Sequence, residues 1–336
     1  MQVCSVDLSQ RVLIIAEAGN NHEGDFAMAR ELVTTAAEAG ADAVKFQTIV
    51  PERLVSPADT ARVAQLGRFQ LSPEQFAELS ELATKSGIAF LSTPFDVGLV
   101  DVLDRIASAF KIASGDNNFT GLLQAVAAKG KPILLSGGIA TIDGLAHSKA
   151  TIKKVWDGMG IDPGLVILHC IAAYPAPPEQ ANLNAIRTIS DQLGVVAGYS
   201  DHTLGNDAAV LSVALGGRVI EKHFTLSKTQ SDFRDHQLSA DPGELRDLVR
   251  RVREAETLLG DGVKRCMPAE EPVAAAARRS ISAARNLQAG SVLSPDDLIC
   301  LRPAGGMEPG NEALLLGRTI KQSLEAGSQF TTDMVD

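Results

Sequence analysis

Eight short apolar runs, separated by helical segments, constrain the fold of this chain more than any other feature of its sequence. The runs are continuously apolar rather than alternating in polarity, which is typical of parallel strands covered on both faces. Between them, segments 26–40 and 72–87 have the spacing of amphipathic helices, and 241–260 closes the series. The runs themselves lie at 12–17, 42–47, 88–93, 109–114, 132–136, 165–170, 195–200 and 218–223.

This pattern predicts an α/β fold, a TIM (β/α)8 barrel over residues 1–262. Eight β/α units in roughly 250 residues fit a barrel better than an open doubly wound sheet, and no GxGxxG turn follows the first run, which weakens a Rossmann alternative. The periodicity stops after Gly260. We expect a linker over 263–279, interrupted by Pro268 and Pro272, and a small mostly-β domain of short strands and turns over 280–336.

Composition excludes several classes of function. The chain has 41 acidic against 31 basic residues, which argues against a nucleic-acid partner, so a bound anion must be held by local cations. The apolar run 12–16 is too short for a signal segment or a membrane span. Its four cysteines are far apart and show no CxxC spacing. We therefore expect a cytoplasmic protein with reduced thiols and no membrane partner.

Polar side chains stand at the ends of most of these runs. In a TIM barrel, functional side chains lie where strands end and the following loops begin. A single charged residue there could be a solvated residue of the barrel mouth, but the recurrence predicts an active site. The residues are Glu17, Lys45, Gln47, Thr93, Lys111, Ser114, Ser136, His169, Ser200, Asp201, His202, Lys222 and His223.

Lys45 and Lys111 lie inside otherwise apolar runs. A lysine in such a place is costly to bury without an anionic partner. One hypothesis is that both lysines bind a substrate that carries a carboxylate and a phosphate, and the alternative is that each pairs with a core carboxylate. Under the first hypothesis, hydroxyl groups would fix the orientation of the anion, and the candidates are Thr93, Ser114, Ser136 and Ser200.

His202 and His223 end two consecutive runs and are candidates for a metal site. Two imidazoles are too few for a closed structural site, so open positions would remain for water and substrate in Lewis-acid catalysis. The alternative is that both are structural core histidines. Glu17 ends the first run, where it is either a general acid/base beside the metal or a carboxylate that orders the following loop.

Several of these run-end motifs together resemble the sialic acid synthase family, which includes N-acetylneuraminate synthase and its relatives for legionaminic and pseudaminic acids. The resemblance covers nearly the whole chain. The tail, with RRSISAARNLQAG (278–290) and LRPAGG (301–306), resembles the antifreeze-like (SAF) domain of that family. The matching barrel segments are IIAEAGNNHEG (14–24), VKFQT (44–48), FLSTPFD (90–96), FKIASGD (110–116), LHCIAAYPAP (168–177), GYSDHTLG (198–205) and EKHFTL (221–226).

The resemblance implies a condensation of phosphoenolpyruvate (PEP) with the open-chain aldehyde of a mannosamine-type hexose, giving a nonulosonic acid and phosphate. It implies that His202 and His223 bind Mn²⁺, with Mg²⁺ or Co²⁺ as alternatives, and that Glu17 transfers protons. It further implies a domain-swapped homodimer in which Arg302 of one subunit reaches the sugar end of the other. The implied substrate contacts are Lys45, Thr93, Lys111 and Ser136 with the carboxylate, Lys111, Ser114 and Ser200 with the phosphate, and Gln47 and Tyr174 with the sugar.

The chain also departs from the family pattern, which leaves the identity of the sugar open. Ala172 stands where sialic acid members carry an Asn that donates to the phosphate, and the loop after VKFQT is short and has no Asn between Thr48 and Ser72. Phe233-Arg234-Asp235-His236 replaces the usual Gly-Pro-Asp-His, which adds a cation.

Two other functions stay open. One is a 3-deoxy-aldulosonate synthase that uses a phosphorylated aldose, with Arg53, Arg62 and Arg68 as the candidates for a second phosphate site. The other is a non-catalytic sugar-binding homologue.

Overall fold

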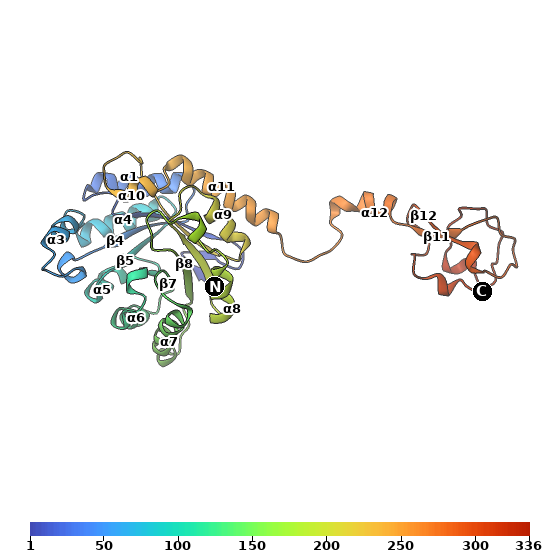
Figure 1. Ribbon diagram of the computed structural model, residues 1–336, viewed down its shortest axis with the longest axis horizontal. Coiled ribbons are helices and arrows are strands. Elements are labelled where there is room, and N and C mark those ends of the chain that lie inside the picture. The colour runs from blue at the N-terminus through green and yellow to red at the C-terminus, as the bar shows by residue number, and fades with distance from the viewer. The chain divides into compact units, whose positions relative to one another are not determined.

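The computed structural model describes residues 1–336, which divide into two compact units, Met1–Gly260 and Asp261–Asp336. The first unit contains an eight-stranded sheet in which every neighbouring pair is parallel, in the order β5-β4-β3-β10-β9-β8-β7-β6 (Figure 1). The two outermost strands of this order, β5 and β6, also contact each other, so the sheet curls into a nearly closed barrel. The predicted barrel fold is confirmed. Its strands are β3 (Leu13–Gly19), β4 (Ala43–Thr48), β5 (Ala89–Pro94), β6 (Phe110–Ile112), β7 (Ile133–Ser136), β8 (Leu165–Cys170), β9 (Val196–Asp201) and β10 (Val219–His223).

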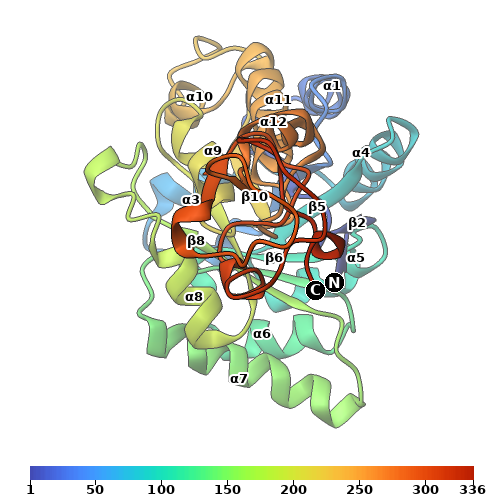
Figure 2. The same ribbon diagram turned by 90° about the vertical axis from the view of Figure 1, so that its right-hand side faces the viewer.

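Helices form a ring outside these strands (Figure 2). Their inward faces are apolar, and some of their starts carry side-chain caps: Ser72 and Gln75 form a capping box at α4, and Asp25 accepts two backbone N–H groups at α1. The helices of this unit are α1 (Phe26–Glu38), α2 (Pro51–Leu54), α3 (Thr60–Gly67), α4 (Pro73–Lys85), α5 (Val100–Asp104), α6 (Thr120–Ala127), α7 (Ile142–Met159), α8 (Ala185–Leu193), α9 (Asp207–Ala214), α10 (Arg234–Leu238) and α11 (Pro242–Leu259).

The interior of the barrel is apolar at one end and polar at the other. A hairpin of β1 (Gln2–Val3) and β2 (Val6–Asp7) packs Val3 and Val6 onto interior residues near the strand starts. Because side chains alternate along a strand, the interior position after an apolar one lies two residues further on. There the chain changes chemistry: Glu17 follows Ile15, Lys45 follows Ala43, and Ser136 follows Leu134. The apolar end fixes the strands, and the polar end forms the floor of a site.

Two segments differ from the prediction. The connection from β4 to α4, expected to be a short loop, contains α2 and α3, which bring the apolar side chains of Leu54 and Leu66 toward Phe69. The expected linker contains a helix, α12 (Glu271–Ala277), because Pro272 lies in its first turn, where proline is tolerated, and alanines follow it.

The second unit is small and mostly β. Strands β11 (Ser280–Ala283) and β12 (Leu298–Leu301) pair antiparallel, and isolated bridges such as Val292 with Thr319 join the turns. The core is a single cluster of apolar side chains, namely Ile281, Ala283, Leu287, Leu293, Leu315, Ile320, Leu324 and Phe330.

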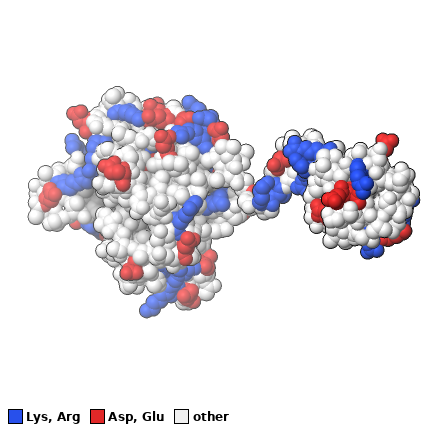
Figure 3. All heavy atoms as spheres, turned by 45° about the vertical axis from the view of Figure 1, so that its right-hand side comes forward, with Lys and Arg blue, Asp and Glu red and all other residues white.

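The surface carries both signs of charge. On the face that Figure 3 shows, Lys and Arg side chains lie among Asp and Glu side chains, without a continuous basic surface. None of the helices combines the length and the apolar character that crossing a lipid bilayer requires.

Candidate active site

Every barrel residue that was predicted to be catalytic, metal-binding or substrate-binding lines one pocket at the carboxyl ends of the strands. This inner pocket is small, with a cavity volume of about 50 Å³. It shares Gln47, Phe95, Ala113, Ser114, Tyr174 and His223 with a larger outer chamber of about 790 Å³. The inner pocket is lined by Glu17, Lys45, Gln47, Thr93, Phe95, Lys111, Ala113, Ser114, Ser136, Cys170, Tyr174, Ser200, His202, Glu221 and His223.

Two lysines and two glutamates form a buried charge cluster on its floor. Lys45 Nζ lies 2.6 Å from Glu17 Oε2 and 3.6 Å from Glu221 Oε2, and Lys111 Nζ lies 3.6 Å from Glu221 Oε1. All four side chains are at most 6% exposed. The structure therefore shows the alternative stated above, in which each lysine pairs with a buried carboxylate. Because the lysines and these carboxylates line the same pocket, the lysines could still bind a substrate anion.

Three hydroxyl groups complete the cluster. Lys45 Nζ donates to Thr93 Oγ1 at 3.2 Å, and Lys111 Nζ donates to Ser136 Oγ at 2.6 Å. Ser200 Oγ donates to Glu221 Oε1 at 2.8 Å. Each lysine is thus held between a carboxylate and a hydroxyl, which is a geometry that can also receive an oxyanion.

The two carboxylates have different proton affinities. Burial raises the pKa of Glu17 above its usual value although Lys45 opposes this shift. Burial alone would also raise the pKa of Glu221, but Lys111 and Lys45 outweigh it and lower the pKa to about 2. Glu17 is therefore the carboxyl that takes up a proton more readily, and Glu221 stays ionised.

The two histidines lie side by side at the strand ends, with ring centroids 5.3 Å apart. His202 Nδ1 is 2.7 Å from the carbonyl oxygen of Ile171, an orientation that assigns the proton to Nδ1 and leaves Nε2 as a free acceptor. His223 Nδ1 is buried without a hydrogen-bond partner, and burial lowers the pKa of His223 well below its usual value. Both rings therefore suit metal ligation.

A metal held here would have two protein ligands. No group of three or more His, Cys, Asp or Glu side chains in the chain is arranged as a metal site. The donor set fits an open site, in which water and substrate supply the remaining ligands, rather than a closed structural one.

Gln47 and Tyr174 lie where the inner pocket meets the outer chamber. Gln47 Nε2 donates to Glu17 Oε1 at 2.9 Å, and Asn20 Nδ2 donates to Gln47 Oε1 at 2.8 Å. The ring of Tyr174 lies 4.2 Å from that of His202 and 5.9 Å from that of His223, measured between centroids. These side chains form the boundary that a substrate would cross.

Sequence reasoning missed Glu221 and Cys170. Both point into the inner pocket, and Cys170 Sγ lies 3.7 Å from His202 Nδ1. The signal for Glu221 was its position two residues before His223, on the same face of the strand.

Three strand-end residues do not line the inner pocket. Lys222 Nζ pairs with Asp201 Oδ2 at 2.7 Å, and both side chains are buried on the opposite side of their strands. His169 Nε2 bonds to the carbonyl oxygen of Ala181 at 2.8 Å. Their roles are structural. Arg302 is an exposed residue of the second unit, directly after β12.

The outer chamber is bounded mainly by loops and short helices rather than by strands. An apolar cluster of Ile49, Leu66 and Phe69, packed against Phe95 and Phe233, forms one of its walls. Ala172 also lines the chamber. Polar and charged side chains complete the lining, among them Asn20, Arg62, Gln65, Asp232, Arg234 and Asp235.

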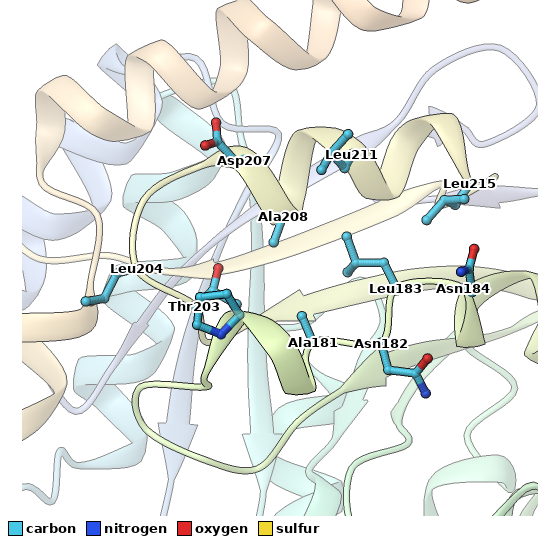
Figure 4. A pocket seen from close by; sticks show the side chains of 11 residues that line it. Ala181, Asn182, Leu183, Asn184, Thr203, Leu204, Asp207, Ala208, Leu211 and Leu215 are labelled. Carbon is cyan, nitrogen blue, oxygen red and sulfur yellow. The ribbon is translucent and has the colours of Figure 1, made fainter.

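A second hollow of about 440 Å³ lies between the segment before α8 and helix α9 (Figure 4). Leu183 faces Ala208 and Leu211 across it, and Asp207 is its one ionisable residue. None of the candidate residues lines this hollow. We therefore assign the candidate active site to the strand ends.

Comparison with known proteins shows the family to which the chain is related. Residues 32–264 match the NeuB family and residues 278–336 match the SAF domain. The chain is 39% identical to N,N'-diacetyllegionaminic acid synthase of Legionella pneumophila, covering 98% of this chain and 96% of that one. It is 32% identical to N-acetylneuraminate-9-phosphate synthase of Mus musculus, covering 96% and 92%. The solved structure of N-acetylneuraminic acid synthetase from Leptospira borgpetersenii, in complex with citrate, superposes with a TM-score of 0.74 at 34% identity, covering 78% and 90%.

Proposed function

Because this chain belongs to the NeuB family, we propose that it joins PEP to the open-chain aldehyde of an N-acylated hexose and releases a nonulosonic acid and phosphate. The chain is a transferase that forms a carbon–carbon bond, as its relatives are synthases of this kind. One observation carries the proposal: an inner pocket with two buried lysines and two histidines opens into a chamber of about 790 Å³, a size that suits a sugar.

In this proposal the inner pocket binds PEP. The carboxylate lies on Lys45, Lys111 and their hydroxyl partners Thr93 and Ser136, while Ser114 and Ser200 join Lys111 at the phosphate. Its support is the arrangement of each lysine beside a hydroxyl, at 3.2 Å for Lys45 and 2.6 Å for Lys111. The bound anion would take the place of carboxylate oxygens that now face the ammonium groups.

The reaction forms one carbon–carbon bond. The electron pair of the PEP double bond attacks the aldehyde carbon through C3, the aldehyde oxygen takes a proton, water adds at C2, and phosphate leaves. Glu17 is the residue that we propose for the proton transfer, since burial raises its pKa and both Lys45 and Gln47 hold it in the inner pocket. Tyr174 and Gln47 would contact the sugar beyond the aldehyde.

We further propose that His202 and His223 hold a divalent metal, Mn²⁺ first, with Mg²⁺ or Co²⁺ as alternatives. When bound, such an ion supplies a Lewis acid that polarises the aldehyde oxygen. The free Nε2 of His202 and the unpartnered Nδ1 of His223 support this assignment.

We also propose a domain-swapped homodimer, in which Arg302 of one subunit reaches the sugar end of the chamber in the other. The SAF match over 278–336, which contains the exposed Arg302, supports this arrangement.

The contacts around the outer chamber do not favour the alternative functions. A phosphorylated aldose needs a second basic site, but Arg53 is already paired with Asp96 at 2.7 Å, and Arg68 does not line the chamber. Arg62 does line it, with its Nη1 donating to Gln65 Oε1 at 2.6 Å, but no second arginine of this segment joins it there. A non-catalytic homologue would not need Glu17, both lysines and both histidines together in one pocket.

Phosphate release tests the proposal. The protein is incubated with PEP and Mn²⁺ and with N-acetylmannosamine, mannose, a 2,4-diacetamido-6-deoxy hexose or a 6-phosphorylated sugar in turn. We expect release with an N-acylated, unphosphorylated sugar. Release with phosphorylated sugars alone would support the aldulosonate alternative, and no release with any sugar would refute the proposed activity.

A further inference from the structure

Arg234 occupies a position that the proposed chemistry does not use. It is the first residue of α10 and lines the outer chamber, and its side chain is 67% exposed. An arginine at the edge of a sugar chamber has five N–H donors to offer.

Two contacts hold the guanidinium group. It lies over the ring of Tyr174, 5.1 Å from the centroid, and its Nε donates to Asp235 Oδ1 at 3.3 Å. Tyr174 in turn packs on His202, so the group is tied to the inner pocket through one aromatic ring. A planar cation held between a ring and a carboxylate is ordered before a ligand arrives, which reduces the entropy cost of binding.

The remaining donors of Arg234 are free. Neither Nη1 nor Nη2 makes a hydrogen bond within the chain, although the side chain lines the chamber. These N–H groups would therefore meet an oxygen acceptor on a bound sugar.

The charge of the chamber decides which oxygen fits. The charged side chains that line it are the cations Arg62 and Arg234 and the carboxylates Asp232 and Asp235, and His223 and Tyr174 are the other ionisable residues there. The cations and carboxylates balance, so a phosphate dianion would find no net positive charge. The apolar wall with Phe69 and Phe233 instead suits a methyl group. A carbonyl group that carries a methyl group could accept from Arg234 through its oxygen and contact the apolar wall through its methyl.

We propose that Arg234 is a specificity residue that donates to the carbonyl oxygen of an N-acyl group on the acceptor sugar. The inference rests on the proposed function, because it assumes that the acceptor sugar lies in the outer chamber. It assigns to Arg234 the preference for acylated over unacylated sugars.

The test compares two sugars that differ in the acyl group. Binding of N-acetylmannosamine and of mannose is measured by calorimetry, together with phosphate release, for the wild type, R234A and R234K. R250A is the matched control, since Arg250 is 64% exposed and also pairs with an aspartate, Asp247, but lies on α11 outside the chamber.

We expect R234A to weaken binding of N-acetylmannosamine about tenfold, as the loss of a charge-assisted hydrogen bond does, and to leave mannose and PEP within about twofold of the wild type. R234K should recover part of this loss, because a lysine keeps the charge but not the fixed fork. R250A should match the wild type for both sugars.

Two results would overturn the inference. An equal change for both sugars would make Arg234 a structural support of Tyr174 alone. If R234A weakened the binding of N-acetylmannosamine 6-phosphate more than that of N-acetylmannosamine, Arg234 would bind a phosphate rather than an acyl group. Calorimetry measures sugar binding without turnover, so it tests Arg234 independently of the reaction. A wild type that binds sugar but releases no phosphate would refute the proposed reaction, and the binding data would still decide the role of Arg234.

Discussion

The inner pocket and the outer chamber are held in place by different means. Most side chains of the inner pocket stand on strand ends and are buried, and several bond to one another, as Lys45 does with Glu17. The chamber is built from loops and short helices, and its wall is an apolar cluster that includes Phe69 and Phe233. Strand ends fix chemistry in place, whereas loops let the size and polarity of a chamber vary without disturbing the barrel.

The largest expected effect on activity is that of replacing His223, the proposed metal ligand of the inner pocket. His223→Ala should lower metal-dependent turnover about a thousandfold, since even outer-shell partners of a metal are worth about 10–100-fold. The fold should survive, because the lost ring is neutral and its Nδ1 bonds to nothing. Bound Mn²⁺ and phosphate release are measured together.

His147→Ala serves as the control, because His147 is exposed on α7 and lies outside both cavities. Unchanged activity or metal content in His223→Ala would refute the metal assignment. The inner pocket would then differ from the chamber only in how its side chains are held.

A smaller effect is expected at Glu221. Glu221→Gln leaves Lys111 without a buried carboxylate partner, so the free energy of unfolding should fall by about 3 kcal/mol. PEP should restore much of that loss, because the substrate anion would meet the same ammonium group. Urea unfolding with and without PEP measures both quantities.

Glu254→Gln, which removes an exposed partner of Arg250, should change stability by less than about 1 kcal/mol. If PEP stabilises Glu221→Gln no more than the wild type, the anion does not bind at the charge cluster, and the contrast between the two cavities weakens.

The smallest expected effect is a pH dependence of the free energy of unfolding, caused by His22 in the loop that also contains Asn20. Burial lowers the pKa of His22 to about 4, so the native state keeps this ring neutral while the unfolded chain protonates it below about pH 6.5. The contribution of His22 to the free energy of unfolding is therefore fully present above pH 6.5 and is lost as the pH falls toward 4. At pH 5 the loss is about 2 kcal/mol. Glu221, with its pKa lowered to about 2, stays ionised throughout.

His22→Asn should flatten this part of the stability curve, since an Asn oxygen can accept the N–H of Gly24 that His22 Nδ1 now accepts. Urea midpoints between pH 5 and 7 measure the change, with His147→Asn as the control. An unaltered slope in His22→Asn would show that the loop is not the acid-sensitive part of the barrel.

The sequence predicted the inner pocket better than the chamber, for a physical reason. Lys45 and Lys111 stand out because a charge in an apolar strand needs a partner, and period-2 alternation then fixes which way it points. The same alternation explains the errors: Glu221 shares the inward face with His223, while Lys222 between them points away to Asp201.

The chamber depends on tertiary contacts that no local pattern specifies. Helices α2 and α3 lie in a segment expected to be a short loop, and Phe69 meets Phe233 from a distant part of the chain, with ring centroids 5.0 Å apart. Loop residues of this kind are positioned by the scaffold beneath them rather than by their own periodicity.

The paired charges on the floor of the inner pocket have a consequence for binding. Glu17 and Glu221 give the lysines anionic partners before any ligand is present, so the resting protein contains its own competitor for the incoming anion. Under the proposed anion binding, PEP would replace a carboxylate beside the lysines rather than fill a vacant positive site. This replacement would weaken the binding of PEP and of released phosphate, because both would compete with the same carboxylates.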